Sequence, residues 1–386
     1  MFTKSVDIVI ILKCMKIPLI LFMILQCGLV LGQSPNDILN VLIINKTITQ
    51  QQADSLRAEA AINQQETDAK RKSFAVNASR LIQLSGFTQL RYLQMEEKGK
   101  RSGFDIRRAR LDIKGSITPY FAYRLQTEFA DKPKILDATG EIKMTDYFIV
   151  TAGQFKIPFS MENLTSSNKL EMIDRSQVVE ALVARGKDVI GNQNGRDIGI
   201  QIGGGVLKKN GIPLLEYRIG LFNGSGINIA DTANDAKDIA GRLVLNPVKG
   251  LSFGGGYYGG YGKANKPNVE GISQARNRLG FEASYVLSRF SVKGEYIFGS
   301  DKEIDRAGWY LQTGYFIIPQ KFQLLAKYDF FDLNTATANT TSISYVVGGN
   351  FNFNSWSRLQ IFYTIRAEQV KSVINNYLAV QFQVGF

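Results

Sequence analysis

The chain has 386 residues, with 46 lysines and arginines against 34 aspartates and glutamates, which gives a formal charge of +12. It has no histidine, and its only cysteines are Cys14 and Cys27, which excludes Ser-His-Asp and Cys-His nucleophiles, imidazole metal ligands and, beyond residue 27, disulfides. An enzyme built on carboxylates is not excluded by this composition, but the usual hydrolases and metalloenzymes are disfavoured, and we expect no enzyme, catalytic residue, cofactor or metal site.

The first predicted element, residues 1–32, has the pattern of a secretory signal peptide. Lysines precede an apolar run over residues 17–31, and Gly32 ends that run at a cleavage site for small residues. The run is shorter than the roughly twenty residues that a membrane-spanning helix needs. The context of Met15 resembles a translation start, so both Met1 and Met15 stay open as the beginning of the chain.

Residues 33–80 are expected to form a helical extension on the periplasmic side. Thr49 to Gln52 has the pattern of a capping box, in which two side chains cap the start of a helix. Large apolar residues are few after it, and they do not sustain a heptad repeat. We expect a solvated spacer or weak coil, and an oligomerisation coil is the alternative.

From residue 81 the helical period gives way to an alternation of apolar and polar residues, which predicts strands to the end of the chain. We count sixteen, at 82–96, 104–117, 119–130, 135–144, 146–155, 196–206, 213–223, 237–246, 250–262, 275–287, 289–300, 305–317, 320–333, 341–354, 356–368 and 373–386. Connections after even-numbered strands are mostly short turns, and those after odd-numbered strands are longer and more polar.

Domain 81–386 is therefore predicted to be an all-β, sixteen-stranded antiparallel transmembrane barrel in the bacterial outer membrane. A soluble sandwich would also alternate, but aromatic residues near the strand ends favour interface girdles: Phe129, Tyr147, Phe222, Tyr285, Tyr310, Phe330, Phe331 and Tyr363. The chain ends YLAVQFQVGF, with an aromatic Phe386 that has the form of an insertion signal for the barrel-assembly machinery. We expect contact with outer-membrane lipid and no nucleic-acid partner.

The alternation also assigns charged residues to the lumen, opposite the apolar face. The candidate anion pathway consists of Arg91, Arg108, Arg110, Arg124, Lys143, Lys156, Arg175, Arg218, Arg242, Arg276 and Arg278. Arg107 falls on the lipid side, near a strand end. The longest loop, 156–195, is expected to fold inward and narrow the pore. Each arginine could instead be a wall residue paired with a neighbouring carboxylate, whereas a surplus of lumen cations would concentrate anions.

Several segments resemble the family of phosphate-selective porins O and P. They are GFTQLRY at 86–92, FDIRRARL at 104–111, GQFKIPF at 153–159 and shorter pieces at 174–176, 196–199, 222–224 and 308–310. The resemblance implies a sixteen-stranded outer-membrane channel, usually a homotrimer, whose arginines and lysines guide small anions such as phosphate or pyrophosphate. Within it, Arg108 and Arg110 match the arginine-rich second strand, and Arg175 is their counterpart in the loop.

Two other functions stay open from the sequence. One is a non-selective or sugar-type diffusion porin, for which Tyr310 and Phe362 lie at lumen positions but make no clear aromatic track. The other is a structural envelope barrel that is anchored to the cell wall through its helical extension. The sequence gives neither the solute nor the pore radius.

Overall fold

The computed structural model describes residues 35–50, 52, 53, 56, 81–229, 236–263, 273–369 and 374–386. The chain divides into two units, Met1–Asn77 and Ala78–Phe386. The predicted signal peptide lies outside the described residues. No helix among the described residues is long and apolar enough to span a membrane.

The described part of the first unit contains the helix α3 (Pro35–Ile44) and the start of a second helical segment. The backbone N–H of Thr49 donates to Oε1 of Gln52 at 2.9 Å, and the backbone N–H of Gln52 donates to Oγ1 of Thr49 at 3.2 Å. These reciprocal bonds confirm the predicted capping box. Residues 57–80 of the expected extension lie outside the described residues.

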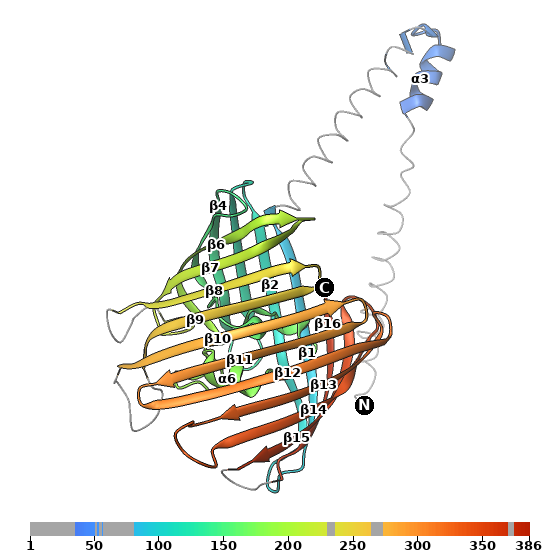
Figure 1. Ribbon diagram of the computed structural model, residues 1–386. Helices are drawn as coiled ribbons and strands as arrows, with labels where there is room; N and C mark the ends of the chain where they lie inside the picture. The colour runs from blue at the N-terminus through green and yellow to red at the C-terminus, as the bar shows by residue number, and fades with distance from the viewer. Residues whose placement is uncertain are drawn as a thin grey trace, which may run out of the picture. The chain divides into compact units, whose positions relative to one another are not determined.

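The second unit is a closed antiparallel barrel of sixteen strands, each paired with its neighbours in sequence and with β1 pairing β16 (Figure 1). The strands are β1 (Gln83–Met95), β2 (Gly103–Ser116), β3 (Phe121–Glu128), β4 (Lys134–Lys143), β5 (Ile149–Lys156), β6 (Arg196–Lys209), β7 (Ile212–Phe222), β8 (Asp238–Val248), β9 (Leu251–Lys263), β10 (Ser273–Leu287), β11 (Phe290–Asp301), β12 (Ile304–Ile318), β13 (Phe322–Asp332), β14 (Thr341–Asn352), β15 (Ser357–Glu368) and β16 (Tyr377–Gly385). All sixteen predicted strands are confirmed, and the soluble sandwich is excluded.

The two ends of the barrel differ in their connections. At the end where β1 begins and β16 finishes, every connection has two to five residues. At the other end the connections reach from residue 157 to 195 in the longest case, although 129–133 and 302–303 are as short as the turns opposite. Because such barrels have short periplasmic turns and longer extracellular loops, we assign the first end to the periplasm.

The outer surface of the barrel is apolar, as expected for a wall that faces lipid. Leu243, Phe281 and Val347 are 52%, 56% and 50% exposed, and they alternate with residues that face the lumen. The backbone of Phe386 exchanges two hydrogen bonds with Gly86, which joins the last residue to the barrel seam. Three predicted girdle residues are wrong, because Phe222, Tyr310 and Phe331 lie in an apolar cluster with residues of the longest loop.

The longest loop crosses the lumen and carries three short helices: α5 (Met161–Leu164), η1 (Ser167–Lys169) and α6 (Gln177–Leu182). In Figure 1, α6 lies inside the ring of strands, and it contacts β11, β12 and β13. Its fully buried residues, such as Val178 and Leu182, share one cluster with Ile297. The hydrophobic effect therefore holds this loop against the inner wall. The predicted inward fold of the loop is confirmed.

Candidate pore-lining site

Polar contacts fix the loop to the barrel wall at β11 and β12. The carboxylate of Glu171 accepts hydrogen bonds from Nζ of Lys293 at 2.9 Å and from Nε2 of Gln312 at 2.6 Å. The carboxylate of Glu295, on β11, accepts the backbone N–H groups of Met161 and Glu162 at 3.0 and 2.7 Å. Charge-assisted hydrogen bonds of this kind are stronger than neutral ones, so the loop has a defined position in the lumen.

A cavity of about 370 Å³ opens between the loop and the extracellular halves of β1, β2 and β13–β16. Its charged lining residues are Arg91, Arg107, Arg108, Arg175, Lys187, Lys327 and Arg366, with Asp174, Glu180 and Asp329. We call this space the outer cavity. Seven cations against three carboxylates give its lining a positive balance.

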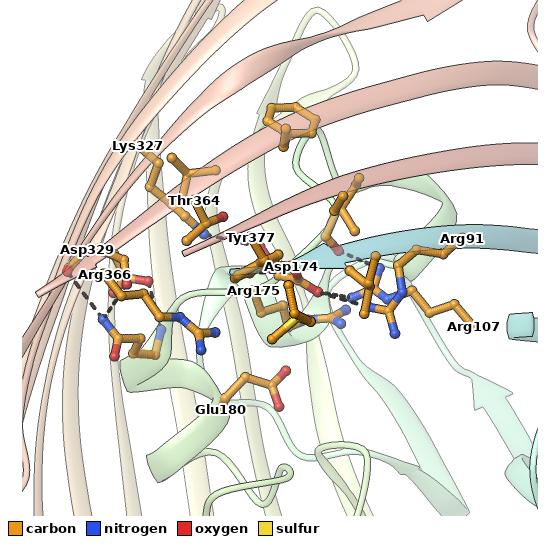
Figure 2. A pocket seen from close by; sticks show the side chains of 18 of the residues that line it. Arg91, Arg107, Asp174, Arg175, Glu180, Lys327, Asp329, Thr364, Arg366 and Tyr377 are labelled. Carbon is orange, nitrogen blue, oxygen red and sulfur yellow. Dashed lines mark hydrogen bonds and ion pairs between the residues drawn. The ribbon is translucent and has the colours of Figure 1, made fainter. Parts of the chain in front are cut away.

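Asp174 is the carboxylate at which cations of the outer cavity converge. Nη2 of Arg107 lies 2.7 Å from its Oδ1, Nη1 of Arg91 lies 3.7 Å away, and the hydroxyl of Tyr377 donates to Oδ2 at 3.0 Å. Figure 2 shows Arg91 and Arg107 reaching Asp174, with Lys327 on the other side. Burial in the lumen raises the pKa of Asp174, but the charges of the two arginines outweigh it and hold the pKa below its usual range. Arg91 also forms two hydrogen bonds with the carboxylate of Asp105, at 3.1 and 2.5 Å, so Asp105 and Asp174 together compensate the charges of Arg91 and Arg107.

The position of Arg107 corrects the sequence analysis, which placed it on the lipid side. The pairing of β1 with β2 shifts after Gln89. Gln89 faces Arg108 and Leu90 faces Ile106, so no residue of β1 lies opposite Arg107 in the strand register. A β-bulge of this kind inserts one residue and re-aims side chains locally. Arg107 points into the lumen, where its Nη1 donates to the carbonyl of Ile173 at 2.5 Å.

Other cations of the outer cavity bind neutral oxygens instead of carboxylates. Nε of Arg108 donates to Oγ of Ser167 at 3.1 Å, and Nε of Arg175 donates to the carbonyl of Glu162 at 3.1 Å. Nζ of Lys327 donates to the carbonyl of Asp174 at 3.1 Å. Burial lowers the pKa of Arg175. Among the described residues, none of these three side chains forms an ion pair, so no carboxylate is in direct contact with their charges.

A second cavity of about 700 Å³ lies in the periplasmic halves of β1–β7, and we call it the inner cavity. Its charged lining residues are Lys114, Arg124, Lys156, Lys208 and Arg218, with Asp137, Glu141, Asp146 and Glu216. Arg124 forms two hydrogen bonds with the carboxylate of Asp112, at 2.9 and 2.7 Å, and lies 3.1 Å from Asp137. The inner cavity is therefore closer to neutral than the outer one.

Basic side chains from the two cavities meet on the loop. Nη2 of Arg175 and Nζ of Lys156 donate to the same carbonyl, that of Thr165, at 2.9 and 3.0 Å. Arg108 and Arg110 likewise share Oγ of Ser167, at 3.1 and 3.3 Å. Arg108 and Arg175 line the outer cavity and Lys156 lines the inner one. Basic side chains that line the two cavities thus lie close together where they bind the loop.

Two members of this region are paired, as the alternative reading of the sequence allowed. Nε of Arg110 lies 2.7 Å from Glu128, and both side chains are almost fully buried. Arg196, which the sequence analysis did not select, binds Asp137 through two hydrogen bonds at 2.6 and 3.2 Å. Their charges are largely compensated, which distinguishes them from Arg108 and Lys156.

The remaining predicted site residues lie elsewhere in the barrel. Lys143 pairs with Asp146 at 2.7 Å at the periplasmic rim, where hydrogen bonds from Lys143 and Lys208 lower the pKa of Asp146 to about 2. Arg242, which faces Arg218 across β7 and β8, pairs with Glu282. These contacts do not test whether Lys143, Arg218 and Arg242 belong to an anion pathway, so that role stays a prediction.

Arg276 and Arg278 are buried beside the loop, with exposures of 2% and 1%. Arg278 lies 2.6 Å from Asp301 and 3.5 Å from Asp188 of the loop, and Arg276 lies 3.4 Å from Asp188 and over the ring of Tyr258. Their contacts fit loop attachment as well as solute contact, so their role also stays a prediction.

The basic lining residues absent from the candidate set are Arg107, Lys187, Lys327 and Arg366 in the outer cavity and Lys114 and Lys208 in the inner one. The alternation of apolar and polar residues puts Lys327 of β13 and Arg366 of β15 on the polar, lumen-facing side of their strands. This alternation is the signal that could have selected them. Lys187 follows α6 in the loop, where no periodicity applies. Among the described residues, no group of three or more Cys, Asp or Glu side chains could hold a metal ion.

Comparison with known proteins agrees with this architecture. The family described as phosphate-selective porin O and P matches residues 83–247 and 260–384. No curated protein matches the chain. An anion-selective porin from Comamonas acidovorans is 15% identical, with 79% of this chain and 99% of that chain covered and a TM-score of 0.58.

Two further solved structures are similar to the barrel. OprB of Pseudomonas putida, in its high-pH structure, is 10% identical, with 81% of this chain and 96% of that chain covered and a TM-score of 0.59. The trimer form of OmpT, an outer-membrane protein of Vibrio cholerae, is 12% identical, with 79% and 99% covered and a TM-score of 0.54. At these identities the likeness shows the fold.

Proposed function

This chain belongs to the phosphate-selective porin O and P family, and we propose that its pore conducts small anions, inorganic phosphate among them. As a member of that family it is an outer-membrane β-barrel porin, a passive channel and not an enzyme. The selectivity of this particular pore is the part that we propose. It follows from the charges along the lumen.

The observation that carries the proposal is the set of uncompensated cations in the outer cavity and beside it. Arg108, Arg175 and Lys327 bind neutral oxygens and form no ion pair among the described residues, whereas Arg91 and Arg107 are paired with Asp105 and Asp174. A surplus of one charge in a narrow lumen with low-dielectric walls raises the local concentration of the opposite ion. Cations are repelled by the same field.

The basic groups at the loop also support a route past it. Arg175, which lines the outer cavity, and Lys156, which lines the inner one, bind the same carbonyl of Thr165, so cationic groups of the two cavities are close together at the loop. Guanidinium groups present parallel donors that suit phosphate oxygens. Conduction needs several moderate sites in series instead of one tight site, and basic groups that already bind neutral oxygens meet that need.

The sugar-type alternative has less support. A sugar track needs exposed aromatic faces along the path, but Tyr310 is 3% exposed and its hydroxyl donates to Glu295 at 2.8 Å. A structural barrel anchored through residues 33–80 does not account for the cations around the loop.

We further propose the finer features expected from the sequence. The chain enters the barrel at the periplasmic end, which supports a periplasmic place for residues 33–80. The exposed ring of Phe386, at the seam between β1 and β16, supports its recognition by the barrel-assembly machinery. A homotrimer is proposed from the family and from the trimer form of the similar OmpT.

The test of phosphate conduction is a titration of chloride current in a planar bilayer that contains the purified protein. We expect phosphate to reduce the chloride current at concentrations well below that of chloride, because a doubly charged anion gains about twice the electrostatic attraction. Sulfate, which carries two negative charges throughout the neutral pH range, is the control for the effect of charge alone. Chloride current that phosphate leaves unchanged would contradict a phosphate site.

A further inference from the structure

One sector of the lumen wall is apolar, which is unusual for a water-filled pore. On the pore-facing side of β14, β15, β16 and β1, the strand pairing places two rows of side chains next to each other. The outer row is Val346, Thr364, Tyr377 and Met95, and the second row is Gly348, Phe362, Ala379 and Leu93. The row below is polar: Asn350, Gln360, Gln381 and Arg91. The two apolar rows thus interrupt a polar lumen.

Packing of the loop explains only part of this apolar sector. Met172 and Ile173 of the loop form a buried cluster with Phe362 and Ala379, which are 2% and 1% exposed. Leu93, Met95 and Val346 are only half-buried, and all three line the outer cavity. We call these three residues the apolar lumen patch. They pack against this cluster with part of their surface and turn the rest toward the outer cavity, so apolar surface remains open to the lumen beside the loop.

An arginine lies at each edge of the apolar lumen patch, but only one of them is free of a carboxylate. Arg366, two residues along β15 from Thr364, stacks over the ring of Tyr377 at 4.8 Å and forms no ion pair among the described residues. Arg91, next to Leu93 on the pore-facing side of β1, is ion-paired with Asp105 and Asp174. Figure 2 shows Arg366 and Arg91 on opposite sides of the cavity, with Tyr377 between them. One cavity therefore offers a cation and an apolar surface together.

We propose that the outer cavity is a binding step for organic anions that carry an apolar body, such as short-chain or aromatic carboxylates. The carboxylate would lie near Arg366 and the hydrocarbon against the apolar lumen patch. Inorganic phosphate gains nothing from apolar surface, whereas burial of hydrocarbon contributes roughly 25 cal/mol per Å². A volume of about 370 Å³ is that of a small-ligand site and accommodates an anion of benzoate size with water. This proposal rests on the proposed anion conduction and names a preferred class of solute.

The test compares acetate, butyrate and benzoate as blockers of chloride current through the purified protein at neutral pH, where all three are charged. We expect the half-blocking concentration to fall from acetate to benzoate by about tenfold, because burial of roughly 55 Å² of the ring at about 25 cal/mol per Å² corresponds to that factor. Equal half-blocking concentrations for acetate and benzoate in the wild-type channel would overturn the proposal without any variant.

A double variant, Leu93→Asn with Val346→Thr, keeps the number of side-chain heavy atoms and replaces apolar atoms by polar ones. We expect the ratio between acetate and benzoate to fall to less than about twofold, since charge attraction stays and hydrocarbon contact is lost. Val347→Thr is the matched control, because Val347 is the next residue of β14 and lies 50% exposed on the lipid face. A ratio that persists in the double variant would contradict the patch, and Val346→Thr alone serves if the double variant does not fold.

Failure of this inference and failure of the proposed function give different results. A wild-type channel without anion preference would remove the proposed function itself. An anion-preferring channel that phosphate blocks as strongly as benzoate would leave that function standing and remove only the preference for organic anions.

Discussion

Replacement of Arg108 by glutamine should weaken anion preference while the barrel stays folded. Arg108 donates to Oγ of Ser167 and to the carbonyl of Arg107, and it forms no ion pair among the described residues. At about 7 Å and an effective dielectric constant between 20 and 80, one unit charge attracts a monovalent anion by roughly 0.6–2.4 kcal/mol. A middle value of about 1 kcal/mol corresponds to about a fivefold lower ratio of chloride to potassium permeability.

Replacement of Arg110 by glutamine is the informative comparison. Arg110 is ion-paired with Glu128 at 2.7 Å in a buried position, so its loss leaves a buried carboxylate without a partner. Breaking such a pair costs about 3–5 kcal/mol of stability. We therefore expect Arg110→Gln, unlike Arg108→Gln, to lower the urea concentration at which the purified barrel unfolds.

The assay is the zero-current potential across a potassium chloride gradient, measured for wild type and both variants. Arg289→Gln is the control, since it removes the same charge from an exposed periplasmic turn. If Arg108→Gln leaves the permeability ratio unchanged, the cations that bind neutral oxygens do not set the selectivity and the reasoning fails.

Three further predictions concern Glu171 and Asp174 of the loop and Phe386 at the barrel seam. Glu171→Gln weakens the bond to Lys293, so it should lower the free energy of unfolding by about 1.5–3 kcal/mol and increase current noise. An equally stable variant without added current noise would contradict the role of Glu171 in holding the loop. The lowered pKa of Asp174 means that its contribution to stability is present above the ordinary aspartate range and is lost as pH falls through the lowered value, below about pH 4. In that window Arg107 loses its partner, so anion preference should rise in wild type and stay constant in Asp174→Asn. Deletion of Phe386 should reduce the folded protein in outer-membrane fractions, and unchanged amounts would count against its role in assembly.

The barrel itself could be predicted from the sequence because each strand has one apolar face, and a period of two is visible without tertiary information. The charges on the opposite face, such as Lys327 and Arg366, follow from the same period. The inward loop could be predicted from its length within a closed lumen.

The errors have local physical causes. Strict alternation puts Arg107 on the lipid side because it assumes that the strand has no β-bulge. The residue inserted after the pairing of Gln89 with Arg108 turns the side chain of Arg107 toward the lumen instead. Phe222 and Tyr310 were read as girdle residues because they lie near strand ends, but they pack with the loop, whose path depends on contacts distant in sequence.

The pairing of the arginines is likewise a tertiary property. Arg278 and Asp188 are ninety residues apart in the chain and become neighbours only when the loop folds against β10. The sequence gives the same arginine pattern for a free cation such as Arg108 and for a compensated one such as Arg110. Free and compensated arginines can therefore be distinguished only by the ion-pair partners that the folded structure brings next to them.

The central claim is that lumen cations without carboxylate partners make this porin prefer anions. It is tested most directly by the zero-current potential of the purified wild-type protein in a planar bilayer that separates concentrated from dilute potassium chloride. We predict a potential with the sign of chloride passing faster than potassium, and one that shrinks at high salt as the lumen charges are screened. A potential near zero, or one of the opposite sign, would contradict the claim.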